Sequence, residues 1–326
     1  MITRCWYFSE LQYLMIGTFL YSLTTGTFLW AGDESYPPPH EIKQSRSQLS
    51  FWLDNMLGKH KYSWEEAALV TGYSVDELKQ QVQEMNIQIH PLKELRNHLI
   101  LPYPGGRHPR IGFLEGAVRP ERSTKVSVFL PQLEVSYVVV DLPEAVFTRQ
   151  GLIFLAHTHI PTIWGERERE IQFQDWQQSP AGGLQNQWTL PDQVQISSSI
   201  LVDGTQVLME LSLHNQSDTP LTQIRSQVCI MLKGAPAFDR LSHDNKIFDD
   251  PVAAVRHEEK NYWILTAWKQ TDRVWGNTEV PCLHVDPILP DCAPGETVRN
   301  RGLIWCVEGS DIHQKIRELK LAVQSL

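Results

Sequence analysis

The stretch QVLMELSLHN, residues 206–215, alternates strictly between two sets of side chains. One set is Val207, Met209, Leu211 and Leu213, and the other is Leu208, Glu210, Ser212 and His214. Successive side chains of a β-strand point to opposite faces of its sheet, so this stretch predicts a strand with one buried and one solvated face.

Similar short runs, rich in Val, Ile, Leu and aromatic residues, lie on both sides of it between turn residues: KVSVFL (125–130), SYVVVDL (136–142), GLIFLAHTHI (151–160), VQISSSILVD (194–203), LTQIRSQVCIMLKG (221–234), NYWILTAW (261–268) and TVRNRGLIWCVEG (297–309). No ten-residue helical pattern separates these runs, which disfavours parallel βαβ units and favours a sandwich or barrel. The polar turn HNQSDTPL (214–221) predicts a hairpin between residues 206–215 and the run that follows. We therefore expect a mainly β protein built on a large antiparallel β-sandwich.

Helices are expected only at the two ends of this β region. Ser63 with Glu66 forms a capping-box pattern, Gly72 marks a helix end, and Ser74 caps a second helix. The segment SDIHQKIRELKLAVQSL (310–326) predicts a C-terminal amphipathic helix. We divide the chain into an N-terminal signal or anchor (1–32), a linker (33–50), a small helical hairpin (51–100) and the β-sandwich with its closing helix (101–326).

The N-terminal residues predict export. Arg4 precedes an uncharged, mostly apolar stretch that ends at Ala31 and Gly32, as in a secretory signal peptide. An uncleaved membrane anchor over residues 11–30 is the alternative, since about 20 apolar residues suffice to span a bilayer. The formal net charge of −9 argues against nucleic acid as a partner, because phosphate backbones are held by clustered Lys and Arg. The sequence does not predict the oligomeric state.

Export places the cysteines in an oxidising compartment, where an even number favours disulfides. Without Cys5, four remain: Cys229, Cys282, Cys292 and Cys306. Cys282 and Cys292 share the Pro-rich segment PCLHVDPILPDC (281–292), which predicts a loop stapled by a Cys282–Cys292 disulfide. Metal binding by Cys282, His284 and Cys292 is an alternative, although their spacing matches no known zinc pattern.

The strand pattern around VLMELSLHNQSDTPL (207–221) and the late PGETVRNRGLIWCVEG (294–309) resembles the β-sandwich of galactose-mutarotase-like proteins. The resemblance covers roughly residues 107–309. The chain is also similar to exported bacterial proteins with HPRIGF-, AHTHIPTIW- and PCLHVDP-type segments. The resemblance implies a carbohydrate ligand, but no short epimerase motif carries over by position.

The segment FLAHTHIPTIW (154–164) holds the main candidate site. His157 and His159 would project from one face of a strand, about 7 Å apart. They could pack in the core, face a sugar, or chelate a divalent metal with His284 or Asp286 as a third ligand. We predict His157, His159 and His108 as catalytic residues and expect no cofactor, with the metal at the histidine pair as the alternative.

Five further residues are predicted to bind substrate: Arg107, Arg110, Trp164, Lys233 and His284. A guanidinium group binds a carboxylate through two parallel hydrogen bonds, so the arginines would suit an acidic sugar. The flat apolar face of a tryptophan ring can pack against a sugar ring. Two functions stay open. The first is an exported carbohydrate-active enzyme of hydrolase, lyase or epimerase type, and the second is a non-catalytic sugar-binding or cell-envelope interaction protein.

Overall fold

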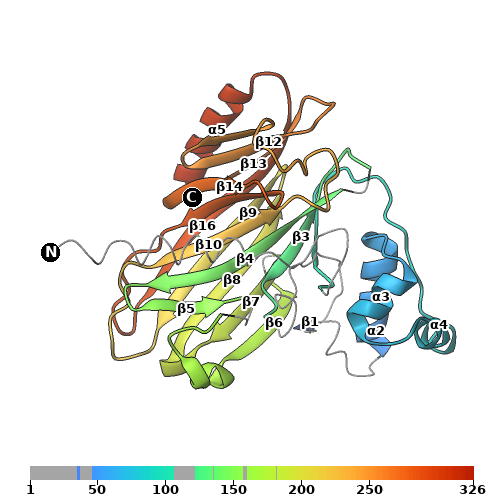
Figure 1. The fold of residues 1–326 in the computed structure, drawn as a ribbon, viewed down its shortest axis with the longest axis horizontal. Helices are drawn as coiled ribbons and strands as arrows, with labels where there is room; N and C mark the ends of the chain where they lie inside the picture. Colours follow the sequence, from blue (N-terminus) through green and yellow to red (C-terminus); the bar gives the residue numbers. More distant parts are fainter. Residues whose placement is uncertain (1–34, 37–45, 106–121, 135, 157–159, 181) are drawn as a thin grey trace.

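A computed structural model describes residues 35–36, 46–105, 122–134, 136–156, 160–180 and 182–326. Two antiparallel sheets dominate them (Figure 1). The nine-stranded sheet contains, in spatial order, β1 (Ser35–Tyr36), β6 (Gln172–Gln178), β7 (Leu184–Thr189), β8 (Val194–Asp203), β9 (Gln206–Asn215), β16 (Thr297–Glu308), β13 (Tyr262–Trp268), β12 (Val252–Arg256) and β11 (Lys246–Asp249). The seven-stranded sheet contains β14 (Thr271–Asn277), β15 (Cys282–Pro287), β10 (Arg225–Met231), β4 (Tyr137–Thr148), β3 (Lys125–Phe129) and β2 (Leu99–Pro102), with β5 (Gly151–Leu155) paired to β4.

The alternation in β9 has the predicted consequence. Val207, Met209, Leu211 and Leu213 are buried, whereas the side chains between them are partly exposed. The buried set joins one continuous apolar core with valines and isoleucines of the seven-stranded sheet, among them Val126, Val140 and Ile230. Ser198 of β8 also donates a hydrogen bond from Oγ to the carbonyl of Leu142, 2.8 Å away, and so links the two sheets. The predicted β-sandwich is confirmed.

Helices occur before and after the sandwich, as expected (Figure 1). The N-terminal group comprises α2 (Arg46–Leu53), the π-helix η2 (Asp54–Lys59), α3 (Trp64–Thr71) and α4 (Val75–Glu84). Ser63 and Ser74 form full capping boxes with Glu66 and Glu77, and Gly72 ends α3 with φ 81°. These helices adjoin the seven-stranded sheet, where His60 bonds to Ser127 Oγ at 3.1 Å and its ring meets that of Phe129 edge-on.

The C-terminal helix α5 (Ile312–Gln324) covers part of the outer face of the nine-stranded sheet. Its buried stripe, Ile312, Ile316, Leu319 and Val323, is the predicted one. It packs on Leu265 and Leu303 of β13 and β16 in a second apolar cluster. Two short 3-10 helices, η3 (Gly165–Glu170) and η4 (Pro191–Gln193), complete the elements. None of the helices in the described ranges is long and apolar enough to cross a membrane.

The hairpin predicted at HNQSDTPL is wrong. β9 belongs to the nine-stranded sheet and β10 to the seven-stranded sheet, so the connection crosses between the layers. Asn215 organises this crossover: its Oδ1 accepts from Ser217 N at 3.1 Å, and its Nδ2 donates to the carbonyls of Thr219 and Cys292. Polar turn residues therefore marked the end of β9 correctly, but they do not specify which sheet the chain enters next.

The disulfide prediction is also wrong. Cys229, Cys282, Cys292 and Cys306 are free thiols. Residues 282–287 form strand β15 between β10 and β14, which turns Cys282 toward Cys229. Cys292 instead lies near the carbonyl of Glu296, 3.3 Å from its Sγ. The Pro-rich composition favours a loop, but β10 and β14 pair with β15 on either side and provide hydrogen-bond partners for its backbone.

The remaining N-terminal predictions, a signal peptide or anchor within residues 1–32, lie outside the described residues. So does most of the linker at residues 33–50, while the other domain boundaries stay predictions.

Candidate functional site

The sequence-predicted catalytic residues His108, His157 and His159, and the substrate-binding Arg107 and Arg110, lie outside the described residues. Their roles stay predictions. The described residues that flank them are close together. The backbone N–H of Arg122 donates to the carbonyl of Ala156 at 2.9 Å, and its guanidinium donates to the carbonyl of Leu155. Residue 122 therefore lies directly beside the end of the described chain at residues 155 and 156.

Two other predicted substrate-binding residues have local partners. Trp164 is half-buried against the main core and donates from Nε1 to the carbonyl of Ile153, 2.7 Å away. Lys233 lies just after β10 and is partly exposed, with its Nζ 3.5 Å from Asp239 Oδ2. The predicted role of each in substrate binding stays a prediction.

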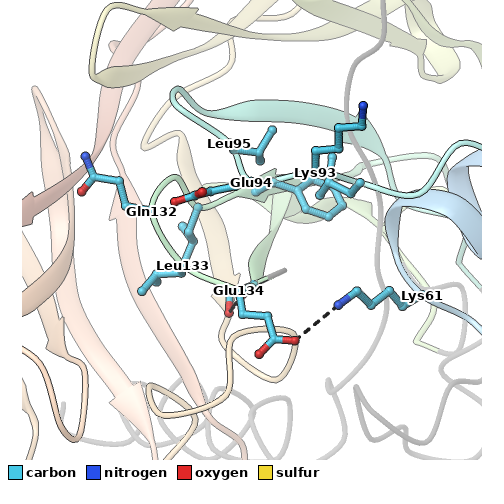
Figure 2. A pocket seen from close by; sticks show the side chains of 11 residues that line it. Lys61, Lys93, Glu94, Leu95, Gln132, Leu133 and Glu134 are labelled. Atoms are coloured by element: carbon cyan, nitrogen blue, oxygen red, sulfur yellow. Dashed lines mark hydrogen bonds and ion pairs between the residues drawn. The ribbon is translucent and has the colours of Figure 1, made fainter.

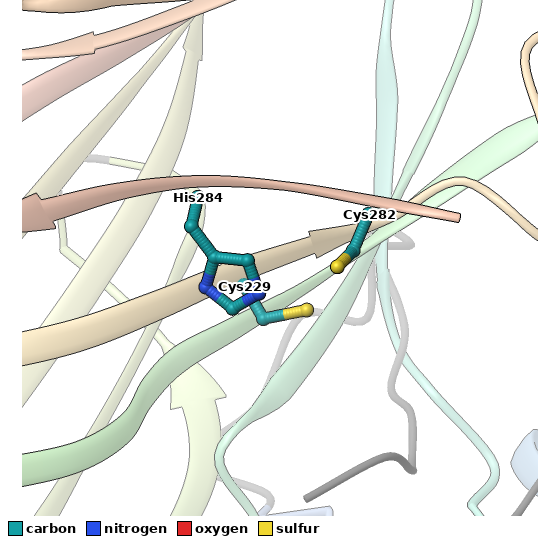
Figure 3. A group of neighbouring side chains, drawn as sticks. All are labelled: Cys229, Cys282 and His284. Atoms are coloured by element: carbon teal, nitrogen blue, oxygen red, sulfur yellow. The ribbon is translucent and has the colours of Figure 1, made fainter. Parts of the chain in front are cut away.

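The last predicted substrate-binding residue, His284, belongs to a buried polar cluster on the seven-stranded sheet. Its members include Cys229 on β10 and Cys282 on β15. Cys229 is directly opposite His284, and Met231 is opposite Cys282, so the two thiols and the imidazole share one face of adjacent strands. Their ligand-type atoms all lie within 4.8 Å of one another. Figure 3 shows the three side chains pointing toward each other.

Cys282 and His284 shift each other's pKa in opposite directions. The hydrogen bond from Cys229 lowers the pKa of Cys282 well below its usual value, although burial opposes the shift. Burial by itself would lower the pKa of His284, but the Cys282 thiolate and the Asp286 carboxylate together raise it to about 10. The two shifts are mutual, because a negative sulfur and a positive imidazole stabilise each other where no water is present.

Asp286 lies beside His284, with 3.8 Å between its Oδ1 and the imidazole Nδ1. Its Oδ2 accepts from Arg273 Nε at 2.7 Å and from Trp275 Nε1 at 2.8 Å, and its Oδ1 accepts from the backbone N–H of Val228 at 3.3 Å. The Trp275 ring stacks on the imidazole of His284 with centroids 3.9 Å apart. The stacked Trp275 ring therefore limits how the imidazole of His284 can turn.

Two buried carboxyl groups on β4 adjoin this region. Burial raises the pKa of Glu144 to about 8, against the opposing charge of His284, and Gln227 Nε2 donates to Glu144 Oε2 at 2.8 Å. Asp141 lies 3.5 Å from Lys125 Nζ, a lysine whose side chain is 1% exposed. A carboxylic acid that keeps its proton near neutral pH is suited to proton transfer.

A second polar region occupies the outer face of the nine-stranded sheet, beside the part that α5 covers. It is a groove of about 240 Å³ lined by Gln174, Gln177, Gln185, Asn186, Gln187, Ser197, Ser198, Ser199, Glu210 and Ser212. The strand register explains the composition, because directly paired residues share a face. One row across the strands is Gln177, Gln185, Ser199 and Glu210, and the next is Gln174, Gln187, Ser197 and Ser212.

The side chains between these rows point inward. Asn186 Nδ2 donates to the carbonyl of Ser123 at 2.7 Å, just as Ser198 reaches Leu142 in the opposite sheet. The groove surface therefore consists mainly of neutral amides and hydroxyls. The carboxylate of Glu210, which also lines the groove, is held by Arg301, whose Nε lies 2.6 Å from Oε2. The sequences QFQDWQQ of β6 and LQNQWT of β7 contain almost no β-branched residues, so the sequence alone does not predict these two strands.

A third hollow of about 320 Å³ lies between the segment after α4 and the turn that follows β3 (Figure 2). Lys61 and Glu134 form an ion pair across it, with 3.6 Å between Nζ and Oε1. The side chains of both are more than half exposed. Exposed ion pairs of this kind contribute little binding energy, so we do not place the function here.

No protein-family model matches the chain, and no curated protein matches its sequence. Solved structures with related architecture include a protein assigned as a kojibiose phosphorylase from the human microbiome, with 9% identity and a TM-score of 0.37 over 72% of this chain and 36% of that one. The heparan sulfate lyase of Pedobacter heparinus has 8% identity and a TM-score of 0.37 over 92% of this chain and 46% of that one. The chain thus spans less than half of the length of either enzyme. These TM-scores are too low to carry any function over to this chain.

Proposed function

We propose that the protein is an exported glycan-recognition protein that binds sugar in the groove formed by β6, β7, β8 and β9. The observation that carries this proposal is the double row of amides and hydroxyls across four strands. Sugar hydroxyls both donate and accept hydrogen bonds. Glutamine and serine side chains also do both, and they carry no charge that would cost more to desolvate.

The dimensions of the groove suit one part of a longer glycan. A volume of about 240 Å³ is below the roughly 300–1,000 Å³ of sites that enclose a drug-sized ligand. Neighbouring strands are about 4.8 Å apart and same-face residues about 6.7 Å apart, so each row offers closely spaced hydrogen-bonding groups. Among the described residues that line the groove there is no aromatic ring. Binding would thus rest on hydrogen bonds and be weak for a single sugar unit.

The test is glycan-array screening of the purified protein with neutral and acidic oligosaccharides, followed by titration calorimetry with the best ligand. We expect Gln187→Leu to weaken binding about two- to tenfold, because one net hydrogen bond contributes about 0.5–1.5 kcal/mol. Gln195→Leu is the matched control. Gln195 lies on the same face of β8, paired with Thr189 and His214, outside the groove. The proposal fails if no glycan binds, or if both variants weaken binding equally.

A second candidate is a carbohydrate-active enzyme, of hydrolase, lyase or epimerase type. The specific observation in its favour is the buried Glu144, whose pKa of about 8 keeps a proton available at neutral pH. Its backbone carbonyl accepts from the N–H of Ala156 at 2.8 Å, next to the predicted histidine pair. Incubating the array's best ligands with the protein and analysing the products by mass spectrometry separates the two functions. Conversion that is lost in Glu144→Gln would support the enzyme.

A further inference from the structure

The Cys229–Cys282–His284 cluster has the composition of a metal centre, independent of the glycan groove. It lies on the other sheet, and all three residues are at most 6% exposed. Two strands that are distant in sequence supply the ligands: β10 supplies one thiol, and β15 supplies the other thiol and the imidazole. Position i and position i+2 of β15 place Cys282 and His284 on the same face.

We propose that Cys229, Cys282 and His284 bind a zinc ion. Thiolate sulfur and imidazole nitrogen are the ligands that zinc prefers, and a Cys₂His set occurs in zinc sites where water completes a tetrahedron. Zn–S bonds of about 2.3 Å and Zn–N bonds of about 2.0–2.1 Å place tetrahedral ligand atoms roughly 3.6–3.8 Å apart. The three ligand atoms already lie within 4.8 Å of one another, so side-chain adjustments of at most about 1 Å complete the site.

The ring nitrogen of His284 that would not bind the metal has a carboxylate close by. His284 Nδ1 is buried and has no hydrogen-bond partner in the described part of the chain, and it lies 3.8 Å from Asp286 Oδ1. Histidines that bind zinc through one ring nitrogen usually donate the other N–H to a carboxylate. Here Nε2 would bind the metal and Nδ1–H would turn to Asp286. Arg273 and Trp275 already hold that carboxylate in place.

Charge balance also favours the ion. Two thiolates and a neutral imidazole around Zn²⁺ form a neutral unit, which costs much less to bury than separate charges. Zinc binding displaces to solvent whichever protons the two thiols and the imidazole still carry, and no electron is transferred. The ion would join β10 to β15. Because the site is closed, it would be loaded as the chain folds.

The test begins with protein purified without chelator and analysed by inductively coupled plasma mass spectrometry. We expect about one zinc per chain in the parent and less than a fifth of that in Cys282→Ser and His284→Gln. Cys306→Ser is the matched control, since Cys306 is a partly exposed thiol on β16 outside the cluster, and it should retain the parent's zinc. Equal zinc loss in the control and the cluster variants would overturn the proposal.

A second measurement avoids variants that fail to fold. Parent protein refolded with cobalt(II) should show an intense thiolate-to-cobalt band in the near ultraviolet and the visible bands of a tetrahedral ion. An absence of the thiolate band, or a Cys229–Cys282 disulfide in the purified protein, would overturn the proposal. Neither result bears on glycan binding in the groove.

Discussion

Replacing the buried Glu144 by glutamine should change how the stability of the protein depends on pH. Glu144 is 3% exposed, and burial raises its pKa from 4.5 to about 8. Between these two values the folded protein retains a proton that the unfolded chain has lost. The stability that this proton contributes is therefore fully present below about pH 4.5 and is lost as pH rises through about 8.

The magnitude follows from linkage. A group that holds one extra proton in the folded state reduces the free energy of unfolding by about 1.4 kcal/mol for each pH unit. From pH 5 to pH 8 the free energy of unfolding of the parent therefore falls by at most about 4 kcal/mol. Because the protein around a buried charge relaxes and reduces its cost, we expect a fall of about 2–4 kcal/mol. Glutamine has no proton to lose, and its amide oxygen still accepts from Gln227. The free energy of unfolding of Glu144→Gln, relative to that of the parent, should therefore rise by about 2–4 kcal/mol from pH 5 to pH 8.

Urea unfolding at pH 5, 6, 7 and 8, with a chelator present so that metal binding does not contribute, measures this difference. Glu134→Gln is the control for loss of a carboxylate, because the side chain of Glu134 is 95% exposed. A parent-minus-Glu144→Gln difference that changes by less than about 1 kcal/mol across the series would refute the reasoning.

Two further predictions test the packing and the thiols. Leu319→Ala on α5 removes a fully buried side chain from the second apolar cluster and should cost about 2–5 kcal/mol in urea unfolding, whereas Leu321→Ala, at a residue 75% exposed, should cost almost nothing. Equal losses would mean that α5 does not pack as described. Alkylation in denaturant without reductant, followed by peptide mass spectrometry, should label Cys282 and Cys292 fully, and a peptide pair joined by a Cys282–Cys292 disulfide would contradict the structure.

The sequence predicted the features that depend on neighbouring residues. The apolar and polar faces of β9, the caps at Ser63 and Ser74, and the buried stripe of α5 all follow from spacing along one element. Each depends on periodicity or on a hydrogen bond to a residue three positions away, so the local sequence suffices. The mainly β fold class followed for the same reason.

The candidate sites were determined by tertiary structure. Gln187 and Ser212 share the groove only because β7, β8 and β9 align in one register. Cys229 lies opposite His284 because β10 pairs with β15. The sequence alone instead suggested Cys292 as the partner of Cys282 and His284. Sheet order and register depend on which faces the whole chain can bury together, so no local pattern specifies them.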